Sequence, residues 1–113
     1  MDNVKNDNYY NEKMMNDMRF IIKHMDNVSY ADFSKDEVLQ DSMMFRLIQI
    51  SENARKLTDS FREKNAEIPW FDIFGLRNRI VHEYGHVDLS IVFETLVKDI
   101  PSVLQTISKK TTV

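Results

Sequence analysis

Apolar residues recur every three or four positions along the first quarter of the chain, and polar residues fill the positions between them. This is the period of a helix that packs one face against its neighbours. The pattern predicts a first helix over residues 8–28. Its apolar face is rich in methionine, whose flexible side chain fills irregular space in protein cores, so we assign these residues no chemistry. The face consists of Met14, Met18, Ile21, Met25 and Val28.

A second and longer helix is predicted from about residue 35 to the polar segment 62–65. Its start is marked by Ser34 and Glu37, which have the spacing of a capping box. The serine hydroxyl would accept from the backbone N–H of Glu37, and the glutamate would reach back. The apolar stripe then keeps the same period for about six turns. Its members are Leu39, Met43, Leu47, Ile50, Ala54, Leu57 and Phe61.

Two further helices follow. Pro69 suits the first turn of a third helix, because the N–H that proline lacks would have no partner there. Gly85 suits its end, where the backbone often turns left-handed. Asp88 can cap a fourth helix, and Pro101 is expected to kink this helix without ending it, because the apolar stripe keeps its phase through the proline. The stripe consists of Leu89, Val92, Leu96, Ile100, Val103 and Ile107.

Four helices with short connections, and no pattern typical of strands, predict an all-α protein that forms an antiparallel up-and-down four-helix bundle. The chain has only two glycines and two prolines among its 113 residues, which favours long helices over a turn-rich β fold. It contains no internal repeat and no low-complexity segment. Residues 1–113 are therefore expected to form a single domain.

The composition narrows the class of protein. Hydrophobic residues make up 42% of the chain and charged residues 29%, as in ordinary folded proteins. The absence of cysteine excludes disulfides, thiol catalysis and cysteine-ligated zinc. Residues 1–5 do not resemble a secretion signal, and no apolar run is long enough to span a membrane, so we expect a cytoplasmic protein without a membrane partner. The net charge of −3 argues against a surface that coats nucleic acid, but it allows a local basic site.

Arg77 lies in the middle of the apolar face predicted for the third helix. An arginine stays charged, and burying it without a partner is costly. It must therefore pair with a carboxylate, for which Asp41 and Glu52 of the second helix are candidates, face another subunit, or line a solvated cleft. At 100° per residue, the side chains within about 60° of Arg77 are Trp70, Ile73, Phe74, Ile80, Val81 and Tyr84.

Asn78 and His82 lie one turn apart on a flank of the same helix, beside Arg77 and Arg79. The amide can orient the imidazole, or both groups can touch one substrate phosphate. Cleaving RNA without a metal requires a base for the 2′-hydroxyl proton, an acid for the leaving 5′-oxygen and a cation on the phosphate. Histidine and arginine supply these groups. This segment therefore predicts a ribonuclease site with no metal and no cofactor.

The same segment also matches the His-Glu-x-x-His pattern of zinc proteases through His82, Glu83 and His86. In that alternative, both histidines bind zinc from one face of a continuous helix, and a third ligand follows downstream. Gly85 lies inside the required turn and is expected to end the helix. Glu94 belongs to the next helix and is a poor third ligand. The ribonuclease interpretation is therefore favoured.

A longer set of residues carries a resemblance to a known family. Pro69-Trp70, the segment from Gly75 to Tyr84 and Val87-Asp88 resemble the HepT-like toxins of the HEPN-domain family. The most specific part is the motif Arg-Asn-x3-His-x-Tyr, which runs from Arg77 to Tyr84. The similarity covers most of the chain and includes Phe33, residues 39–41, Glu52 and residues 99–101.

The resemblance implies an all-helical, HEPN-like homodimer that acts as a metal-independent endoribonuclease toxin and is paired with a small nucleotidyltransferase antitoxin. It implies that Arg77 and His82 are catalytic and that Asn78 and Arg79 support them or bind RNA. It also implies that Tyr84 is the tyrosine to which the antitoxin attaches AMP, which would block the RNA site with bulk and negative charge. A dimer suits the chemistry as well, because each chain offers one suitable histidine whereas the reaction uses both an acid and a base.

A second class of function stays open. The same bundle could act without catalysis, as a nucleotide-binding or adaptor subunit of a nucleotidyltransferase. Arg77 would then hold a phosphate, and His82 would have no role. Tight binding of a nucleotide or partner, without RNA cleavage, would distinguish this function from a ribonuclease.

Overall fold

The computed structural model describes residues 6–83 and 85–111, and every regular element in these two ranges is helical. The long segments are α1 (Asp7–Met25), α3 (Glu37–Arg55), α5 (Trp70–His82) and a continuous run of α6 (Leu89–Glu94), η1 (Thr95–Asp99) and α7 (Ile100–Thr111). Two short helices, α2 (Tyr30–Lys35) and α4 (Asp59–Lys64), lie in the connections. The all-α prediction is confirmed.

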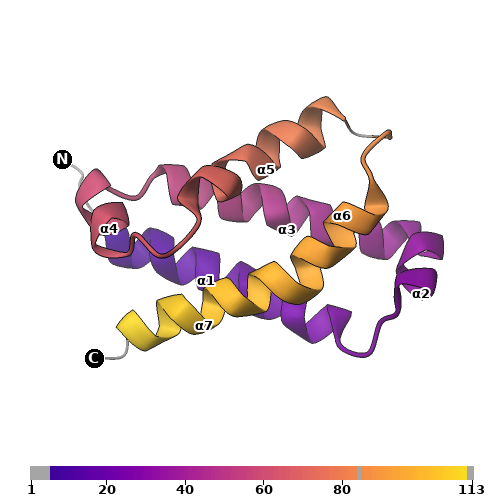
Figure 1. Ribbon diagram of the computed structural model, residues 1–113, viewed down its shortest axis with the longest axis horizontal. Coiled ribbons are helices and arrows are strands. Elements are labelled where there is room, and N and C mark those ends of the chain that lie inside the picture. Colours follow the sequence, from indigo (N-terminus) through magenta and orange to yellow (C-terminus); the bar gives the residue numbers. More distant parts are fainter. Residues whose placement is uncertain (1–5, 84, 112–113) are drawn as a thin grey trace.

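The long segments run in alternating directions along the molecule (Figure 1). α3 packs most extensively, against α5 on one side and against α1 on another, and α7 and η1 pack against α1. In α5, only Ile73 and Ile80 are buried. α5 is therefore attached to the body mainly through α3, and much of its surface faces solvent.

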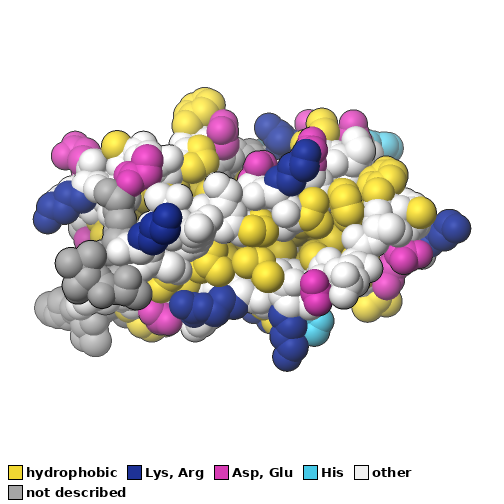
Figure 2. All heavy atoms as spheres, turned by 60° about the horizontal axis from the view of Figure 1, so that its bottom comes forward, with side chains coloured by type: hydrophobic (Ala, Val, Ile, Leu, Met, Phe, Trp, Pro, Cys, Tyr) yellow, Lys and Arg dark blue, Asp and Glu magenta, His cyan; other side chains and the backbone are white. Residues whose placement is uncertain are grey.

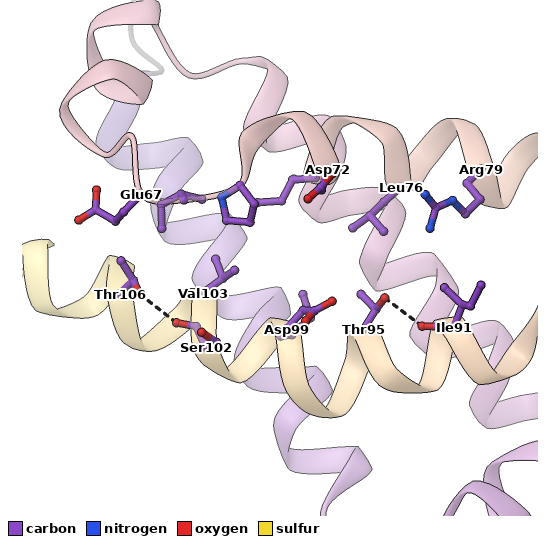
Figure 3. A pocket seen from close by; sticks show the side chains of 14 residues that line it. Glu67, Asp72, Leu76, Arg79, Ile91, Thr95, Asp99, Ser102, Val103 and Thr106 are labelled. Atoms are coloured by element: carbon purple, nitrogen blue, oxygen red, sulfur yellow. Dashed lines mark hydrogen bonds between the residues drawn. The ribbon is translucent and has the colours of Figure 1, made fainter.

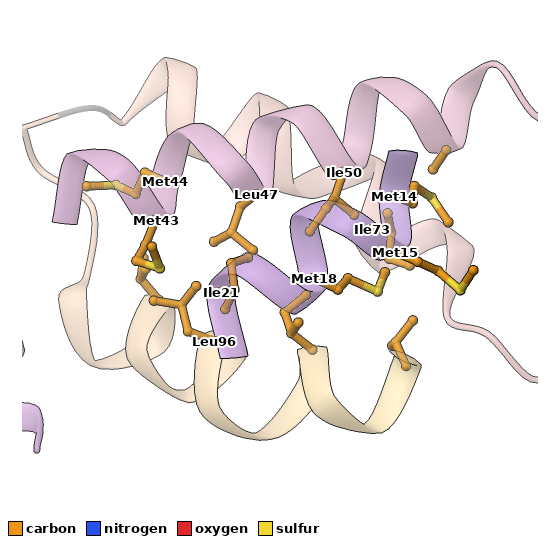
Figure 4. Close-up of a cluster of buried hydrophobic side chains, with 14 of the residues drawn as sticks. Met14, Met15, Met18, Ile21, Met43, Met44, Leu47, Ile50, Ile73 and Leu96 are labelled. Atoms are coloured by element: carbon orange, nitrogen blue, oxygen red, sulfur yellow. The ribbon is translucent and has the colours of Figure 1, made fainter. Parts of the chain in front are cut away.

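The methionine-rich face of α1 lies at the centre of the core, as predicted. Met14, Met18 and Ile21 are completely inaccessible to solvent. Full burial of one such side chain stabilises the fold by roughly 1.5–3 kcal/mol, so this face is a principal source of stability. Figure 4 shows it packed among residues of α3, α5 and η1, which include Met43, Met44, Leu47, Ile50, Ile73 and Leu96.

An ion pair joins α1 to α3 beside this core. Arg46 Nη1 lies 2.8 Å from Asp17 Oδ1. The guanidinium carbon of Arg46 also lies 3.7 Å from the centre of the Phe20 ring, close enough for a cation–π interaction. Asp17 is only 8% exposed, so its charge depends on Arg46 for compensation.

The predicted capping box at Ser34 and Glu37 is wrong. Ser34 lies inside the short helix α2, where its hydroxyl donates to the carbonyl oxygen of Ala31 at 2.9 Å. The cap of α3 is Asp36, whose carboxylate accepts from the backbone N–H of Leu39 at 3.0 Å. Both residues have capping chemistry, and the sequence pattern did not reveal that residues 30–35 form a separate helical turn.

The second predicted helix is also interrupted. α3 ends at Arg55, and α4 begins at Asp59 with Thr58 as its cap. The carboxylate of Asp7, at the start of α1, accepts from the backbone N–H of Thr58 at 2.9 Å and from its hydroxyl at 2.7 Å. The break keeps Leu57 buried, so the apolar periodicity gave no sign of it.

The predicted ends of the later helices agree with the structure. Pro69 directly precedes α5, Gly85 has a positive φ of 92°, and the Asp88 carboxylate accepts from the backbone N–H of Ser90 at 2.9 Å. The helix continues through Pro101, as predicted. Proline has no backbone N–H, so one hydrogen bond of the helix is missing at Pro101. The helix accommodates Pro101 with the π-helical turn η1, which lies just before it.

Candidate active site on α5

The start of α5 is anchored by Trp70. Its indole N–H donates to the carbonyl oxygen of Asn65 at 3.0 Å, and its ring packs between Phe61 and Phe74, with ring centres 6.3 Å and 6.5 Å away. An aromatic side chain with a satisfied polar group provides a large apolar contact at little cost. Trp70 therefore fixes where α5 begins relative to α4.

The middle of α5 is held by two donors from α3. The Ser51 hydroxyl and Arg55 Nη2 both approach the carbonyl oxygen of Phe74, at 3.2 Å and 3.3 Å. Ser51 is fully buried, and Arg55 is exposed. Neither residue is part of the motif predicted from the sequence. Ser51 lies one residue before Glu52, and Arg55 lies three residues after it. Both residues are therefore on the flank of α3 nearest α5.

Arg77 pairs with Glu52, one of its two predicted partners. Arg77 Nε lies 3.2 Å from Glu52 Oε2, and Arg77 Nη1 donates to the side-chain oxygen of Asn78 at 3.4 Å. The side chain of Arg77 is 41% exposed and that of Glu52 is 44% exposed. The guanidinium is therefore held at the surface through Nε and one N–H of Nη1, which leaves three N–H groups for a bound phosphate.

The buried face of α5 is offset from Arg77. Ile73 and Ile80 are buried, whereas Val81 is 44% exposed, although the helical wheel placed all three beside Arg77. Arg77 thus lies at the edge of the packed face, which lowers the cost of keeping its charge.

His82 is the last residue of α5, and both Asn78 and His82 are exposed. Within the described part of the chain, no hydrogen bond or ion pair joins the imidazole of His82 to another residue. The structure thus brings Arg77 and Asn78 into contact and places His82 one turn further along, free to meet a substrate. Tyr84, the predicted modification site, lies outside the described residues.

Arg79 faces a different side of α5. It lines a pocket of about 390 Å³ between α5 and the α6–α7 run, together with Leu76 and Asp72. Figure 3 shows Leu76 and Arg79 on the α5 side and Ile91 and Thr95 on the other. Arg79 is therefore separated from the Arg77–Glu52 pair by the width of the helix.

The geometry of the zinc-protease alternative is not met. α5 ends at His82, and the positive φ of Gly85 turns the chain away before His86, so the two histidines do not follow one another on a continuous helix. Among the described residues, no group of three histidine, aspartate or glutamate side chains gathers as metal ligands would.

Surface charge is mixed. Figure 2 shows hydrophobic side chains in the middle of one face, with basic and acidic side chains interspersed along its edges. No described helix is both long and apolar enough to cross a membrane. Because the net charge is −3, binding of nucleic acid would depend on a local cluster of cations such as the arginines of α3 and α5.

Comparison with known proteins identifies the family. Residues 14–109 match the family model described as ribonuclease HepT-like. The chain is 37% identical over 92 residues to "Putative RNase TTE0752" of Caldanaerobacter subterraneus subsp. tengcongensis, which covers 81% of this chain and 82% of that protein. It is 27% identical over 93 residues to "Probable ribonuclease HepT" of Thermococcus cleftensis, which covers 82% and 84% of the two chains. No solved structure matches the chain significantly. The protein therefore belongs to the HepT-like ribonuclease family.

Proposed function

We propose that this protein is a metal-independent endoribonuclease whose reacting groups are Arg77 and His82. The observation that supports this most strongly is the way Glu52 holds Arg77. The ion pair uses Nε and Asn78 accepts from Nη1, so Nη2 and the second N–H of Nη1 can bind the oxygens of a phosphodiester. His82 is exposed on the same helix, where a bound RNA strand could reach both groups.

In the proposed reaction, an imidazole acting as base removes the proton of a ribose 2′-hydroxyl. The 2′-oxygen forms a bond to the adjacent phosphorus, and the bond from phosphorus to the 5′-oxygen breaks as an acid protonates that oxygen. Arg77 stabilises the charge on the phosphoryl oxygens. The products are a 2′,3′-cyclic phosphate and a 5′-hydroxyl.

The acid and the base are proposed to come from two copies of the chain. Each chain supplies one histidine on α5, and the imidazole of His82 has no partner within the described part of its own chain. Phe45, two turns before Glu52 on α3, and Val81, one turn after Arg77 on α5, are 55% and 44% exposed. These apolar side chains near the ion pair would be covered in a homodimer. Phe45→Glu should then yield a monomer without cleavage activity, as measured by sedimentation and RNA cleavage.

Regulation is proposed to occur through a nucleotidyltransferase antitoxin in a toxin–antitoxin pair of the type II or type VII kind. The modified residue would be Tyr84, two positions after His82. Each attached AMP adds a bulky group and a phosphate charge at this position of the chain, which we expect to exclude RNA. The intact mass of the protein, measured with and without the antitoxin, tests this directly. The mass of the wild type should increase by one AMP unit when the antitoxin is present. The mass of the Tyr84→Phe control should stay unchanged.

The proposed activity is tested with purified protein and single-stranded RNA in the presence of a chelator. Wild type should cleave and leave cyclic phosphate ends, and His82→Ala should be slower by about 10²- to 10⁴-fold. His24→Ala is the matched control, because His24 is an exposed histidine on α1. Equal rates for wild type and His82→Ala would rule out this mechanism.

A second candidate is a non-catalytic nucleotide-binding or adaptor subunit of a nucleotidyltransferase. It is favoured by the lack of any hydrogen bond that orients His82 within the described chain. In that case the wild type would bind nucleotide tightly and would not cleave RNA or arrest growth on expression.

A further inference from the structure

Phe71 is the most exposed large hydrophobic side chain in the described part of the protein, at 87%. Single exposed apolar residues are common and need no explanation on their own. The position of Phe71 on α5 is what makes it informative.

Phe71 lies on the same face of α5 as Asn78 and His82. Phe71, Gly75, Asn78 and His82 follow one another at spacings of four, three and four residues. These spacings place the four residues within about 60° of one another around the helix. Phe71, Asn78 and His82 are all exposed. The aromatic ring is therefore part of one continuous surface that ends at His82, about 16 Å along the helix axis.

Gly75 leaves this surface bare between Phe71 and Asn78. A glycine in the middle of a helix costs about 1 kcal/mol relative to alanine, so a reason for its presence is expected. A Cβ atom at Gly75 would meet nothing within 4 Å, so packing within the chain does not require glycine here. A molecule outside the described chain can therefore approach the helix backbone closely at this point.

Arginines border the surface on both sides. On the α3 side lie Arg77 and Arg55, whose guanidinium carbon is 5.4 Å from the centre of the Phe74 ring. On the opposite side lies the exposed Arg79, and the carboxylate of Asp72 lines the pocket on that side. Guanidinium groups that bind phosphates, combined with an aromatic face that stacks on bases, are the chemistry that recognises single-stranded nucleic acid.

We propose that this face of α5 is a track for single-stranded RNA, with Phe71 stacking on a base that lies beyond the scissile phosphate. The RNA backbone passes over Gly75, and Arg55 and Arg79 bind the flanking phosphates. The inference rests on the proposed ribonuclease function and adds to it the part of the site that holds the substrate. A second copy of the chain could also cover an apolar face, and the test separates that occupant from RNA.

The experiment measures RNA binding by fluorescence anisotropy in the full-length His82→Ala background, which prevents cleavage. The probes are a labelled oligoadenylate and an abasic ribose-phosphate oligomer of the same length. Phe71→Leu keeps an apolar side chain and removes the ring, whereas Phe71→Tyr keeps the ring. Phe71→Leu should weaken oligoadenylate binding by roughly 5- to 150-fold, the effect of stacking one base. Phe71→Tyr should bind like the parent, and neither change should affect the abasic oligomer.

A second variant tests the path of the RNA backbone. Gly75→Ala adds only a Cβ atom, which has room in the folded chain, so its melting temperature should be equal to or higher than that of the parent. It should weaken the binding of both oligomers, because the side chain blocks the close approach.

Three results would overturn the proposal. The first is equal oligoadenylate affinity for the parent and Phe71→Leu, and the second is no RNA binding by the parent. The third is a change of oligomeric state in Phe71→Leu, measured by sedimentation, which would make this face a protein contact. Cleavage by the protein with its native His82 is assayed separately. Cleavage that persists alongside any of these results would leave the proposed function intact.

Discussion

Arg77 Nε lies 3.2 Å from Glu52 Oε2, so the cation of the candidate site is oriented by a neighbouring helix. Both side chains are more than two-fifths exposed, and exposed ion pairs contribute little to stability. The pair therefore matters more for the direction of the guanidinium than for the fold. Replacing Glu52 or Arg77 should therefore change the cleavage rate much more than the stability of the fold.

Glu52→Ala should lower the cleavage rate by about tenfold or more, because a misdirected arginine loses contact with the transition state. Glu52→Gln should keep most of the activity, since an amide oxygen can still accept from Arg77 Nε. Thermal unfolding of both variants should stay close to that of the wild type. Single-turnover kinetics and melting temperatures measure the two effects, and an equal loss in both variants would show that orientation is not the role of Glu52.

Arg77→Lys should be nearly as inactive as Arg77→Ala. Lysine keeps the charge, but it has a single nitrogen. It therefore cannot pair with Glu52 and bind a phosphate through separate nitrogens, as arginine can. The rate at saturating RNA is the measurement, with Arg55→Lys as the comparison. Because Arg55 is proposed to contact a flanking phosphate, its substitution should raise KM and leave kcat largely unchanged. Full activity of Arg77→Lys would mean that charge alone is sufficient.

Asp17→Ala should destabilise the protein by about 1–3 kcal/mol, because it leaves Arg46 packed against Phe20 without its carboxylate. Urea denaturation followed by circular dichroism measures this change. Arg46→Met, combined with Asp17→Ala, should recover part of the loss, since the pair is then replaced by apolar contact. If the double variant is destabilised by the sum of the single changes, the two residues do not interact energetically.

Asp88 should make the start of α6 sensitive to acid. The Ser90 hydroxyl and backbone N–H donate to its carboxylate and lower the pKa of Asp88 below its ordinary value of 3.8. Because the folded pKa is the lower one, the cap is fully effective above pH 3.8 and is lost as the pH falls through the folded pKa. Amide exchange of Ser90 and Ile91 should therefore accelerate at acid pH. In Asp88→Asn, which cannot ionise, this local change should disappear.

The periodicity of apolar residues predicted the all-helical fold because burial of one helix face is a local property of spacing. It predicted the core methionines for the same reason, whereas the helix ends at Pro69, Gly85 and Asp88 were predicted from the backbone and capping chemistry of these residues. It did not predict the break at residues 56–58, because Leu57 stays in phase across it. Nor did it separate the roles of Ser34 and Asp36, which have the same capping chemistry.

The candidate site shows the same division. The segment 77–84 alone specified an arginine, an amide and a histidine at helical spacing, and it named Glu52 as one of two possible partners. Only the packing of α5 on α3 decided that Glu52 holds Arg77 through Nε and that Arg79 faces the pocket on the other side. Spacing along one helix determines which side chains share a face, whereas the direction from which a neighbouring helix approaches determines which face is buried. The spacing of residues along the chain was therefore enough to predict the four long helical segments and the reactive side chains of α5, whereas the packing of these segments sets which side chains are buried and which are exposed.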